Sequence, residues 1–310
     1  TNYGWGPSCP NCSGCDSSYI GSCTDIGHWW AWFRGPNSAS YLSALYTESD
    51  QHASYSRLPT NPGGPNQIIM FKSCFPNSDL GGSPSDPVPP IGSNPLRGQG
   101  VGSPYHTVAN AKGIYLDLLN YFATRQDKLF VVIAAPPLVA NATDATAAAN
   151  ARAFNNWLVN DWLAGYPYNN VSVFDFYNVL TSNGGNTSTN DLGWSAGNHH
   201  RWWNGAVQHL QTVNNNFSSY GSSPGDSHPT AAGNQKATGE FVPLLNVFYN
   251  RWQSLQARIF LPVVMKGYPP AMAYALAPTR TPTRTVTPTP VATATPTALP
   301  TATPTTTATP

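Results

Sequence analysis

Hydrophobic and polar positions divide the chain into short apolar runs and longer segments with helical spacing. Three apolar runs have the length and composition of buried strands: 67–74, 128–137 and 171–176. Three further segments place apolar residues three and four positions apart, as an amphipathic helix does: 107–126, 143–165 and about 237–252. In the second of these, Thr143 is predicted to cap the start and Gly165 the end.

This alternation of strands and helices predicts an α/β fold with a parallel sheet that is covered on both faces. Ligands of such sheets bind beyond the carboxyl ends of the strands. The loop after 67–74 and the loop that holds Asp226 and His228 are both expected there. The long connection 190–210 is also of interest, because long loops in compact domains are usually functional.

The composition restricts the classes of partner. Only 9% of the 310 residues are charged and the net charge is +1, which gives no basis for a nucleic-acid partner. Aromatic residues make up 12% of the chain, with 10 Trp, and this is typical of extracellular proteins that meet sugars. No apolar run approaches the roughly 20 residues of a membrane helix, so no membrane span is predicted.

The chain changes character from about Ala277, where "PTRTPTRTVTPTPVATATPTALPTATPTTTATP" follows. Such a segment cannot bury enough apolar surface to offset the entropy of ordering it, so we expect a disordered stalk or linker that could attach the protein to a cell surface. The predicted organisation is a Cys- and Trp-rich N-terminal part, an αβ core, a short connecting segment and the stalk: 1–65, 66–256, 257–276 and 277–310.

The five cysteines favour a disulfide-tied loop over a metal or iron–sulfur site. "CPNCSGC" has the spacing of a metal-binding loop, but no second Cys or Cys/His pair completes it. Disulfides suit a secreted protein. Cys74 follows an apolar run and is expected to be buried.

The segment "GDSHPT" places two titratable residues just before the last predicted helix. Asp226 could bond one imidazole nitrogen of His228 and leave the other free to take a proton from a nucleophile. Pro229 suits the first turn of the helix. The alternative is that Asp226 or Ser227 only caps the helix.

The block "GDSHPTAAGNQKATGEFVPLL" resembles the closing block of the SGNH (GDSL-type) hydrolases, which places Asp and His just before the last helix. The family has its Asp three residues before His, where this chain has Gly225. In the family a strand also runs into a G-x-N-D turn whose Asn helps to form the oxyanion hole. Here Phe75-Pro76-Asn77-Ser78 follows the apolar run, so Asn77 matches that Asn.

The resemblance covers about residues 66–252, including the helix 107–126 and the strand that ends in a Pro pair. It implies a three-layer αβα sandwich of flavodoxin-like, SGNH-hydrolase type with a mainly parallel sheet. It also implies ester hydrolysis by acyl transfer, with His228 as base, Asp226 orienting it, Asn77 at the oxyanion, and neither metal nor organic cofactor.

The nucleophile of the family lies in a G-D-S-x-T-D-x-G block after its first strand. "GSCTDIG" resembles this block, with Ser22 or Cys23 at the position of the nucleophile. The Asp before Ser22 is absent, and no apolar strand precedes it. We therefore expect the nucleophile block to lie upstream of Thr1 and the chain to be a fragment, with Ser22 as the alternative.

The remaining His and Trp residues have competing interpretations. His199 and His200 could ligate a metal, but no third ligand is placed by spacing, and adjacent side chains of a strand point opposite ways. Asp175 either lines the cleft or is structural. Five Trp residues could stack on sugars, although packing is favoured: Trp29, Trp30, Trp32, Trp202 and Trp203.

Taken together, these patterns predict a secreted or surface-bound SGNH-like hydrolase that acts on a small-molecule or glycan ester, with acetylated glycans as a candidate. The rival interpretation is a non-catalytic carbohydrate-binding or adhesion module on the same fold. A nucleophile separates the two, because a binding module does not need one.

Overall fold

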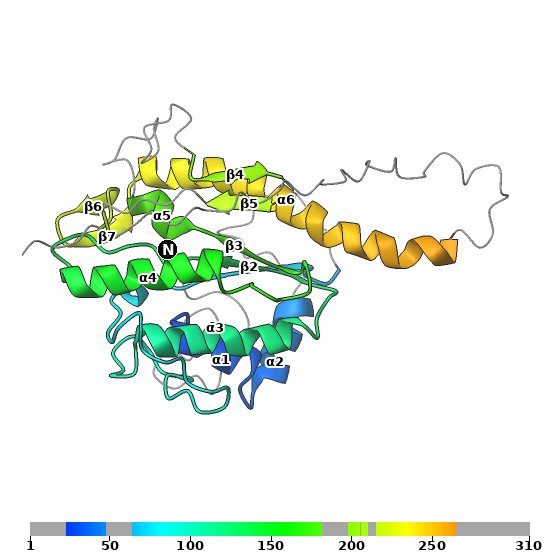
Figure 1. Cartoon of the computed structure of the whole chain (residues 1–310), viewed down its shortest axis with the longest axis horizontal. Helices are drawn as coiled ribbons and strands as arrows, with labels where there is room; N and C mark the ends of the chain where they lie inside the picture. The colour runs from blue at the N-terminus through cyan, green and yellow to red at the C-terminus, as the bar shows by residue number, and fades with distance from the viewer. Residues whose placement is uncertain (1–22, 48–63, 182–197, 205, 210–214, 265–310) are drawn as a thin grey trace, which may run out of the picture. The chain divides into compact units, whose positions relative to one another are not determined.

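The computed structural model describes five parts of the chain: 23–47, 64–181, 198–204, 206–209 and 215–264. Over these residues the protein is a mixed α/β fold with six α-helices around a three-stranded parallel sheet (Figure 1). The predicted parallel sheet is therefore confirmed. By internal contacts the chain divides into two compact units, Thr1–Leu261 and Pro262–Pro310.

The sheet consists of β1 (Ile68–Lys72), β2 (Leu129–Ile133) and β3 (Val171–Phe174), in that spatial order. All three lie within the predicted apolar runs. Successive side chains of a strand point to opposite faces. In β2, Phe130 and Val132 join one hydrophobic cluster while Leu129 and Val131 join the other. Both faces of the central strand β2 are thus buried, as its continuous apolar run requires, whereas Met70 of the edge strand β1 is exposed.

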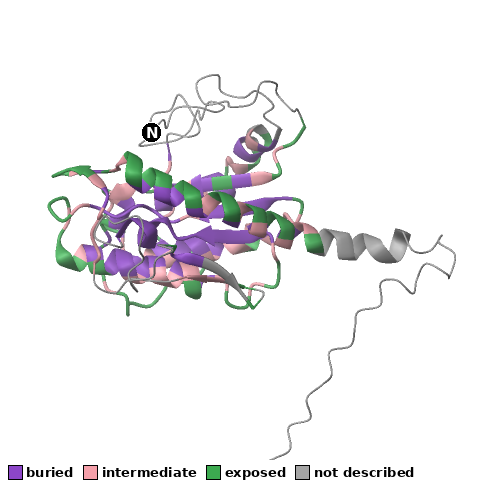
Figure 2. Ribbon diagram, turned by 90° about the horizontal axis from the view of Figure 1, so that it is seen from above, coloured by how far each residue is buried: buried purple, intermediate pink, exposed green. Residues whose placement is uncertain are grey.

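Most helical side chains of the first cluster come from α1 (Ile26–Phe33), α2 (Ser38–Thr47), α3 (Val108–Phe122) and α4 (Ala145–Asn160). The second draws them from α5 (Phe176–Thr181) and α6 (Ala231–Val264). In Figure 1, α3 and α4 lie on one side of the strands and α6 on the other. Figure 2 shows the buried residues gathered in the strands and on the helix sides that face them.

Side-chain caps start the two long helices on the first face. The Thr107 hydroxyl accepts from the Asn110 N–H at 3.3 Å, and Asp144 Oδ1 accepts from the Ala147 N–H at 2.8 Å. The prediction that Thr143 caps α4 is wrong. Its hydroxyl instead donates to Asp79 Oδ1 at 2.7 Å, because the carboxylate one residue later is the better acceptor for the helix N–H groups.

Two antiparallel hairpins that the apolar pattern did not predict lie between α5 and α6. One pairs β4 (His200–Trp203) with β5 (Ala206–His209), and the other pairs β6 (Gly221–Ser223) with β7 (Asp226–Pro229).

The second hairpin corrects the expected start of the last helix. Pro229 pairs with Gly221 in the hairpin and is not in the first helical turn. Gly225 adopts a φ of +85°, which reverses the chain and lets residues 226–229 run back along β6. The helix α6 begins only at Ala231, and the Thr230 hydroxyl accepts from the Gly233 N–H at 3.3 Å.

Among the helices that the described residues form, none combines the length and the hydrophobicity needed to traverse a lipid bilayer.

Candidate functional site

The carboxyl end of the sheet brings the two predicted blocks together. The strand β1 ends at Lys72 and leads into the short 3-10 helix η2 (Phe75–Ser78), which holds Asn77. The Phe75 ring meets the His228 ring edge-on, with centroids 4.8 Å apart. Phe75 and His228, 153 positions apart in the chain, therefore form one surface at the edge where ligands of parallel sheets bind.

Asp226 and His228 form a hydrogen-bonded pair on this surface. Asp226 Oδ1 accepts from the His228 N–H at 2.9 Å and lies 2.6 Å from His228 Nδ1. These hydrogen bonds, from the backbone and then from the ring, lower the pKa of the Asp226 carboxyl below its usual value. The His228 side chain is 49% exposed, so its Nε2 can reach a ligand while Nδ1 is held.

The hairpin that carries the pair is fastened to the loop after β2. The Ser227 hydroxyl accepts from the Val139 N–H at 3.1 Å, and Asn141 Oδ1 accepts from the Gly225 N–H at 2.9 Å. Within the hairpin, the Ser222 hydroxyl donates to the His228 carbonyl at 2.7 Å. Asp226 and His228 are thus held by contacts from the loop after β2 and from within the hairpin.

Asn77 is buried and connects the end of β1 to the start of α1. Its Oδ1 accepts from the Ile26 N–H at 2.8 Å, and its Nδ2 donates to Asp25 Oδ1 at 2.8 Å and to the Cys74 carbonyl at 3.3 Å. Both amide hydrogens are directed at protein acceptors in this arrangement. Donation to an oxyanion would require one of them to be released, and the weaker bond to Cys74 is the one more easily exchanged.

Asp25 is a residue that the sequence analysis did not single out. Besides Asn77, its Oδ2 accepts from the Val101 N–H at 3.0 Å, and its own N–H donates to His28 Nδ1 at 3.2 Å. A Cβ on Gly100 would meet Asp25 Oδ2 at 3.0 Å, so the loop approaches closely there. The signal that could have found it is the second Asp of the motif G-D-S-x-T-D-x-G.

The candidate nucleophile Ser22 lies outside the described residues. The residue after it, Cys23, is buried and disulfide-bonded, and its carbonyl accepts from the Trp32 indole at 2.9 Å. The disulfide agrees with the expectation of disulfide-tied cysteines for this one residue. Trp29 and Trp32 are buried in the core, which confirms packing for these two, and the side chains of Trp202 and Trp203 lie outside the description.

A second polar cluster is buried between the hairpin β4–β5 and α6. Glu240 Oε2 accepts from the N–H groups of His199 and His200, at 2.8 and 3.2 Å, and lies 2.8 Å from His200 Nδ1. Lys236 Nζ donates to Glu240 Oε1 at 3.0 Å. His199 precedes the strand, so strand alternation does not separate the two histidines and both reach the same carboxylate.

Burial alone would raise the pKa of Glu240, but its hydrogen bonds with His199 and His200 and the charges of His200 and Lys236 bring the pKa well below its usual range. Asp175, at the end of β3, is also buried, and burial raises its pKa. Its N–H donates to His200 Nε2 at 3.1 Å, and its Oδ1 accepts from the Asn178 N–H at 3.0 Å. These bonds give Asp175 a structural role in joining β3, α5 and the hairpin.

The described residues contain no group of three or more His, Cys, Asp or Glu side chains arranged to hold a metal ion. Comparison of the chain with family models, with curated proteins and with solved structures finds no match.

Proposed function

We propose that the protein is an ester hydrolase of SGNH type, built as a three-layer αβα sandwich. The observation that carries the proposal is the Asp226–His228 hydrogen bond of 2.6 Å, with an exposed imidazole beside the turn that holds Asn77. A helix cap needs no such pair, and the cap of α6 is supplied by Thr230 instead.

The proposed nucleophile is Ser22, since the residues just after it pack against the turn that holds Asn77. Asp25 accepts a hydrogen bond from Asn77, and the N–H of Ile26 donates to the same side chain. The block that resembles the family's nucleophile motif therefore meets the block that resembles its oxyanion motif. This continuity at the carboxyl edge of the sheet favours Ser22 over a nucleophile elsewhere.

In the proposed reaction, Ser22 Oγ attacks the ester carbonyl as its proton passes to His228 Nε2. The tetrahedral oxyanion receives an Asn77 amide hydrogen in exchange for the bond to the Cys74 carbonyl. Collapse breaks the ester bond, and His228 returns the proton to the departing alcohol. Water then attacks the acyl-serine with His228 again as base, which releases the acid and restores Ser22. The ester is a small molecule or an acetylated glycan.

The test compares hydrolysis of p-nitrophenyl acetate and of acetylated xylan by the wild-type chain and by Ser22→Ala and His228→Gln. Each variant is expected to lose a factor of about 1,000 or more in kcat/KM, because Ser22 and His228 act together as nucleophile and base. Ser93→Ala, an exposed serine in another loop, is the matched control and should keep full activity. A kcat/KM of His228→Gln that stays within a factor of about ten of the wild-type value would contradict the proposal.

Asp226→Asn separates orientation from proton transfer. Both side chains of the pair are more than two-fifths exposed, at 49% and 43%, so solvent weakens their interaction. We expect kcat to fall by only about tenfold, far less than in His228→Gln. A loss as large as that of His228→Gln would show that Asp226 does more than orient the ring.

A further inference from the structure

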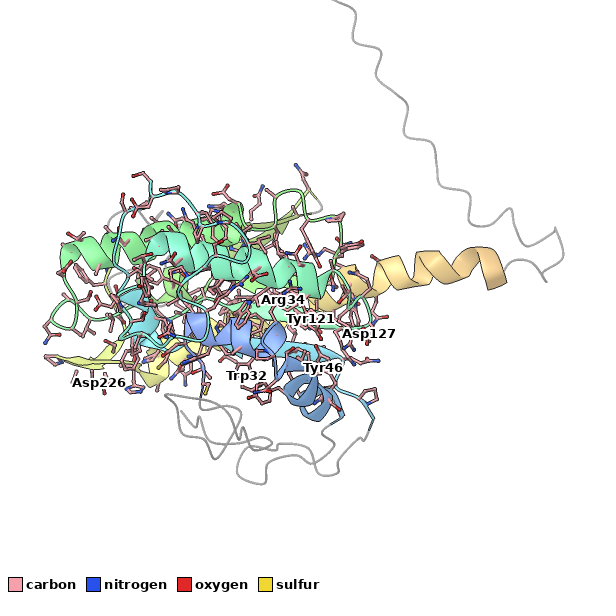
Figure 3. All side chains as sticks on the ribbon, turned by 90° about the horizontal axis from the view of Figure 1, so that it is seen from below. Trp32, Arg34, Tyr46, Tyr121, Asp127 and Asp226 are labelled. Carbon is pink, nitrogen blue, oxygen red and sulfur yellow. The ribbon has the colours of Figure 1, made fainter. Side chains whose placement is uncertain are left out.

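A pocket of about 530 Å³ lies among α1, α2 and the end of α3 and takes no part in the proposed hydrolysis. Tyr121 is near the end of α3, and Arg125 shortly precedes β2, so the pocket lies toward the amino ends of the strands. The Asp226–His228 pair lies beyond their carboxyl ends. Figure 3 shows Asp226 at one end of the view, with Tyr46 and Tyr121 well separated from it.

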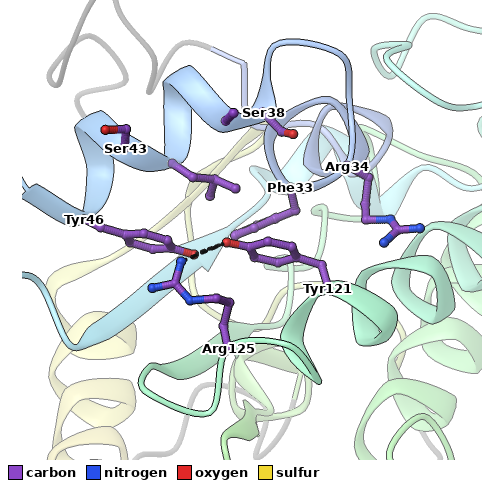
Figure 4. Close-up of a pocket in the computed structure, with 9 residues that line it drawn as sticks. Phe33, Arg34, Ser38, Ser43, Tyr46, Tyr121 and Arg125 are labelled. Atoms are coloured by element: carbon purple, nitrogen blue, oxygen red, sulfur yellow. Dashed lines mark hydrogen bonds between the residues drawn. The ribbon is translucent and has the colours of Figure 1, made fainter.

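The wall of the pocket is aromatic and aliphatic: Phe33, Leu42, Tyr46 and Tyr121. The Tyr46 and Tyr121 hydroxyls are 2.8 Å apart, and the rings of Phe33 and Tyr121 have centroids 5.7 Å apart. Burial, together with the bond to Tyr121, raises the pKa of Tyr46 far above its usual value. The Tyr46 hydroxyl therefore stays protonated, and the two hydroxyls meet as a polar point in a wall that is otherwise apolar (Figure 4).

Two cationic side chains, Arg125 and Lys128, lie against the Tyr46 ring on one side of this wall. The Arg125 guanidinium lies 4.4 Å from the Tyr46 ring centroid and Lys128 Nζ lies 5.0 Å from it. Both pair with Asp127, at 2.7 Å for Arg125 Nη2 and 3.6 Å for Lys128 Nζ. Two positive charges thus share one carboxylate, and the Asp127 side chain is itself 57% exposed.

Arg34 supplies the charge on another side. Its Nε lies 3.5 Å from Asp117 Oδ1, and the same buried carboxylate also pairs with Arg97. The Arg34 side chain is 34% exposed, so its guanidinium stays partly accessible to a ligand beside this contact. Across both sides, four described cations contact two described carboxylates. Among the residues that the structure describes, the charges around the pocket are therefore positive in balance.

We propose that this pocket binds a small organic anion that carries a carboxylate on a ring. The ring packs on the wall formed by Phe33, Tyr46 and Tyr121, and the carboxylate pairs with the terminal nitrogens of Arg34 in the two-bond geometry that guanidinium and carboxylate favour. Arg125 adds positive potential beneath the ring. Sugar acids and aromatic acids share this chemistry, and the experiment distinguishes them.

The experiment is isothermal titration of the whole chain with sodium glucuronate and with sodium benzoate, each at about millimolar concentrations. Saturable binding of at least one of them is expected, and which one binds tells whether the ring is a sugar or an aromatic. Acetate, which lacks the ring, and methyl glucoside and benzyl alcohol, which lack the charge, should bind at least about tenfold more weakly. Acetate that binds as tightly as both acids would overturn the proposal, as would no saturable binding of either acid.

Three variants locate the site. Arg34→Gln should weaken binding about tenfold or more. Ala39→Phe fills the pocket from its exposed rim without changing any charge, and should abolish binding. Lys112→Gln removes an equal charge from a lysine that contacts the Trp157 ring outside the pocket, and should leave binding unchanged. Equal weakening by Arg34→Gln and Lys112→Gln, or unchanged binding in Ala39→Phe, would refute the site.

Discussion

Asn77 is the residue at which a catalytic and a structural role make different predictions. Its side chain is buried and satisfies the Ile26 N–H, the Asp25 carboxylate and the Cys74 carbonyl. In Asn77→Ala the Ile26 N–H loses its acceptor, so the free energy of unfolding should fall by about 2 kcal/mol, measured by urea denaturation. Asn110→Ala, which removes an exposed side-chain bond to the Tyr105 carbonyl, should cost less than about 0.5 kcal/mol.

The same variant tests the oxyanion role. If Asn77 donates to the oxyanion, kcat should fall by a factor of about 100 or more while KM changes little, under conditions where the variant is folded. A purely structural Asn77 would lower stability and leave kcat of the folded fraction near the wild-type value. The second result would remove Asn77 from the proposed mechanism while leaving the Asp226–His228 pair in place.

For single residues, the sequence pattern predicts pairs that are close together in the chain. It does not predict pairs that only the fold brings together. Asp226 and His228 are two positions apart, so their pairing could be predicted without the fold. Asp25 and Asn77 are 52 positions apart, and only the packing of α1 beside the end of β1 brings them together. Glu240 was missed for the same reason, because its partners His199 and His200 come from a distant hairpin.

Among the elements, prediction worked where the apolar pattern was continuous. The strands β2 and β3 are buried on both faces and β1 on one, so their runs of apolar residues stand out from the flanking polar sequence. The hairpins are short and partly polar, and turn geometry sets them more than hydrophobic pattern does. Asn204, with a φ of +49°, precedes Gly205, and an Asn-Gly pair between short strands is the signal that could have predicted the first hairpin.

The hairpin β4–β5 carries a prediction about pH. His209 is partly buried at the end of β5, and its ring centroid is 5.1 Å from that of His200. Burial and then the charge of His200 lower the pKa of His209 to about 3. Between about pH 6.5 and this value the unfolded chain binds a proton that the folded chain does not. Protonation therefore favours unfolding, and His209 makes the protein less stable as the pH falls.

His209→Gln should reduce the loss in the free energy of unfolding by about 1.4 kcal/mol for each pH unit below about 6. The measurement is the free energy of unfolding in urea at several pH values down to about 5. Gln208→Ala changes the neighbouring residue of the same strand without removing a titratable group, and should keep the wild-type slope. Equal slopes in His209→Gln and Gln208→Ala would show that His209 does not carry the effect.

For the whole molecule, the contacts of α6 indicate how far along the chain residues still contribute to the stability of the folded core. Trp252 is buried, and its indole donates to the Gln126 carbonyl at 2.9 Å. Arg251 Nη2 donates to the Val171 carbonyl at 3.0 Å and to the Ser172 hydroxyl at 2.9 Å. These two residues fasten α6 to the amino ends of β2 and β3. The Thr- and Pro-rich sequence that begins near Ala277 has no apolar periodicity with which to add to this core.

A chain that ends after Gln256 should therefore unfold at the same urea concentration as the full chain, while one that ends after Asn250 should lose about 3–5 kcal/mol because it lacks Trp252. The two truncations differ by only six residues, so the comparison isolates the contribution of this anchor. If the chain that ends after Gln256 is also destabilised by more than about 1 kcal/mol, residues after Gln256 contribute to the fold. The boundary predicted between the αβ core and the connecting segment is then wrong.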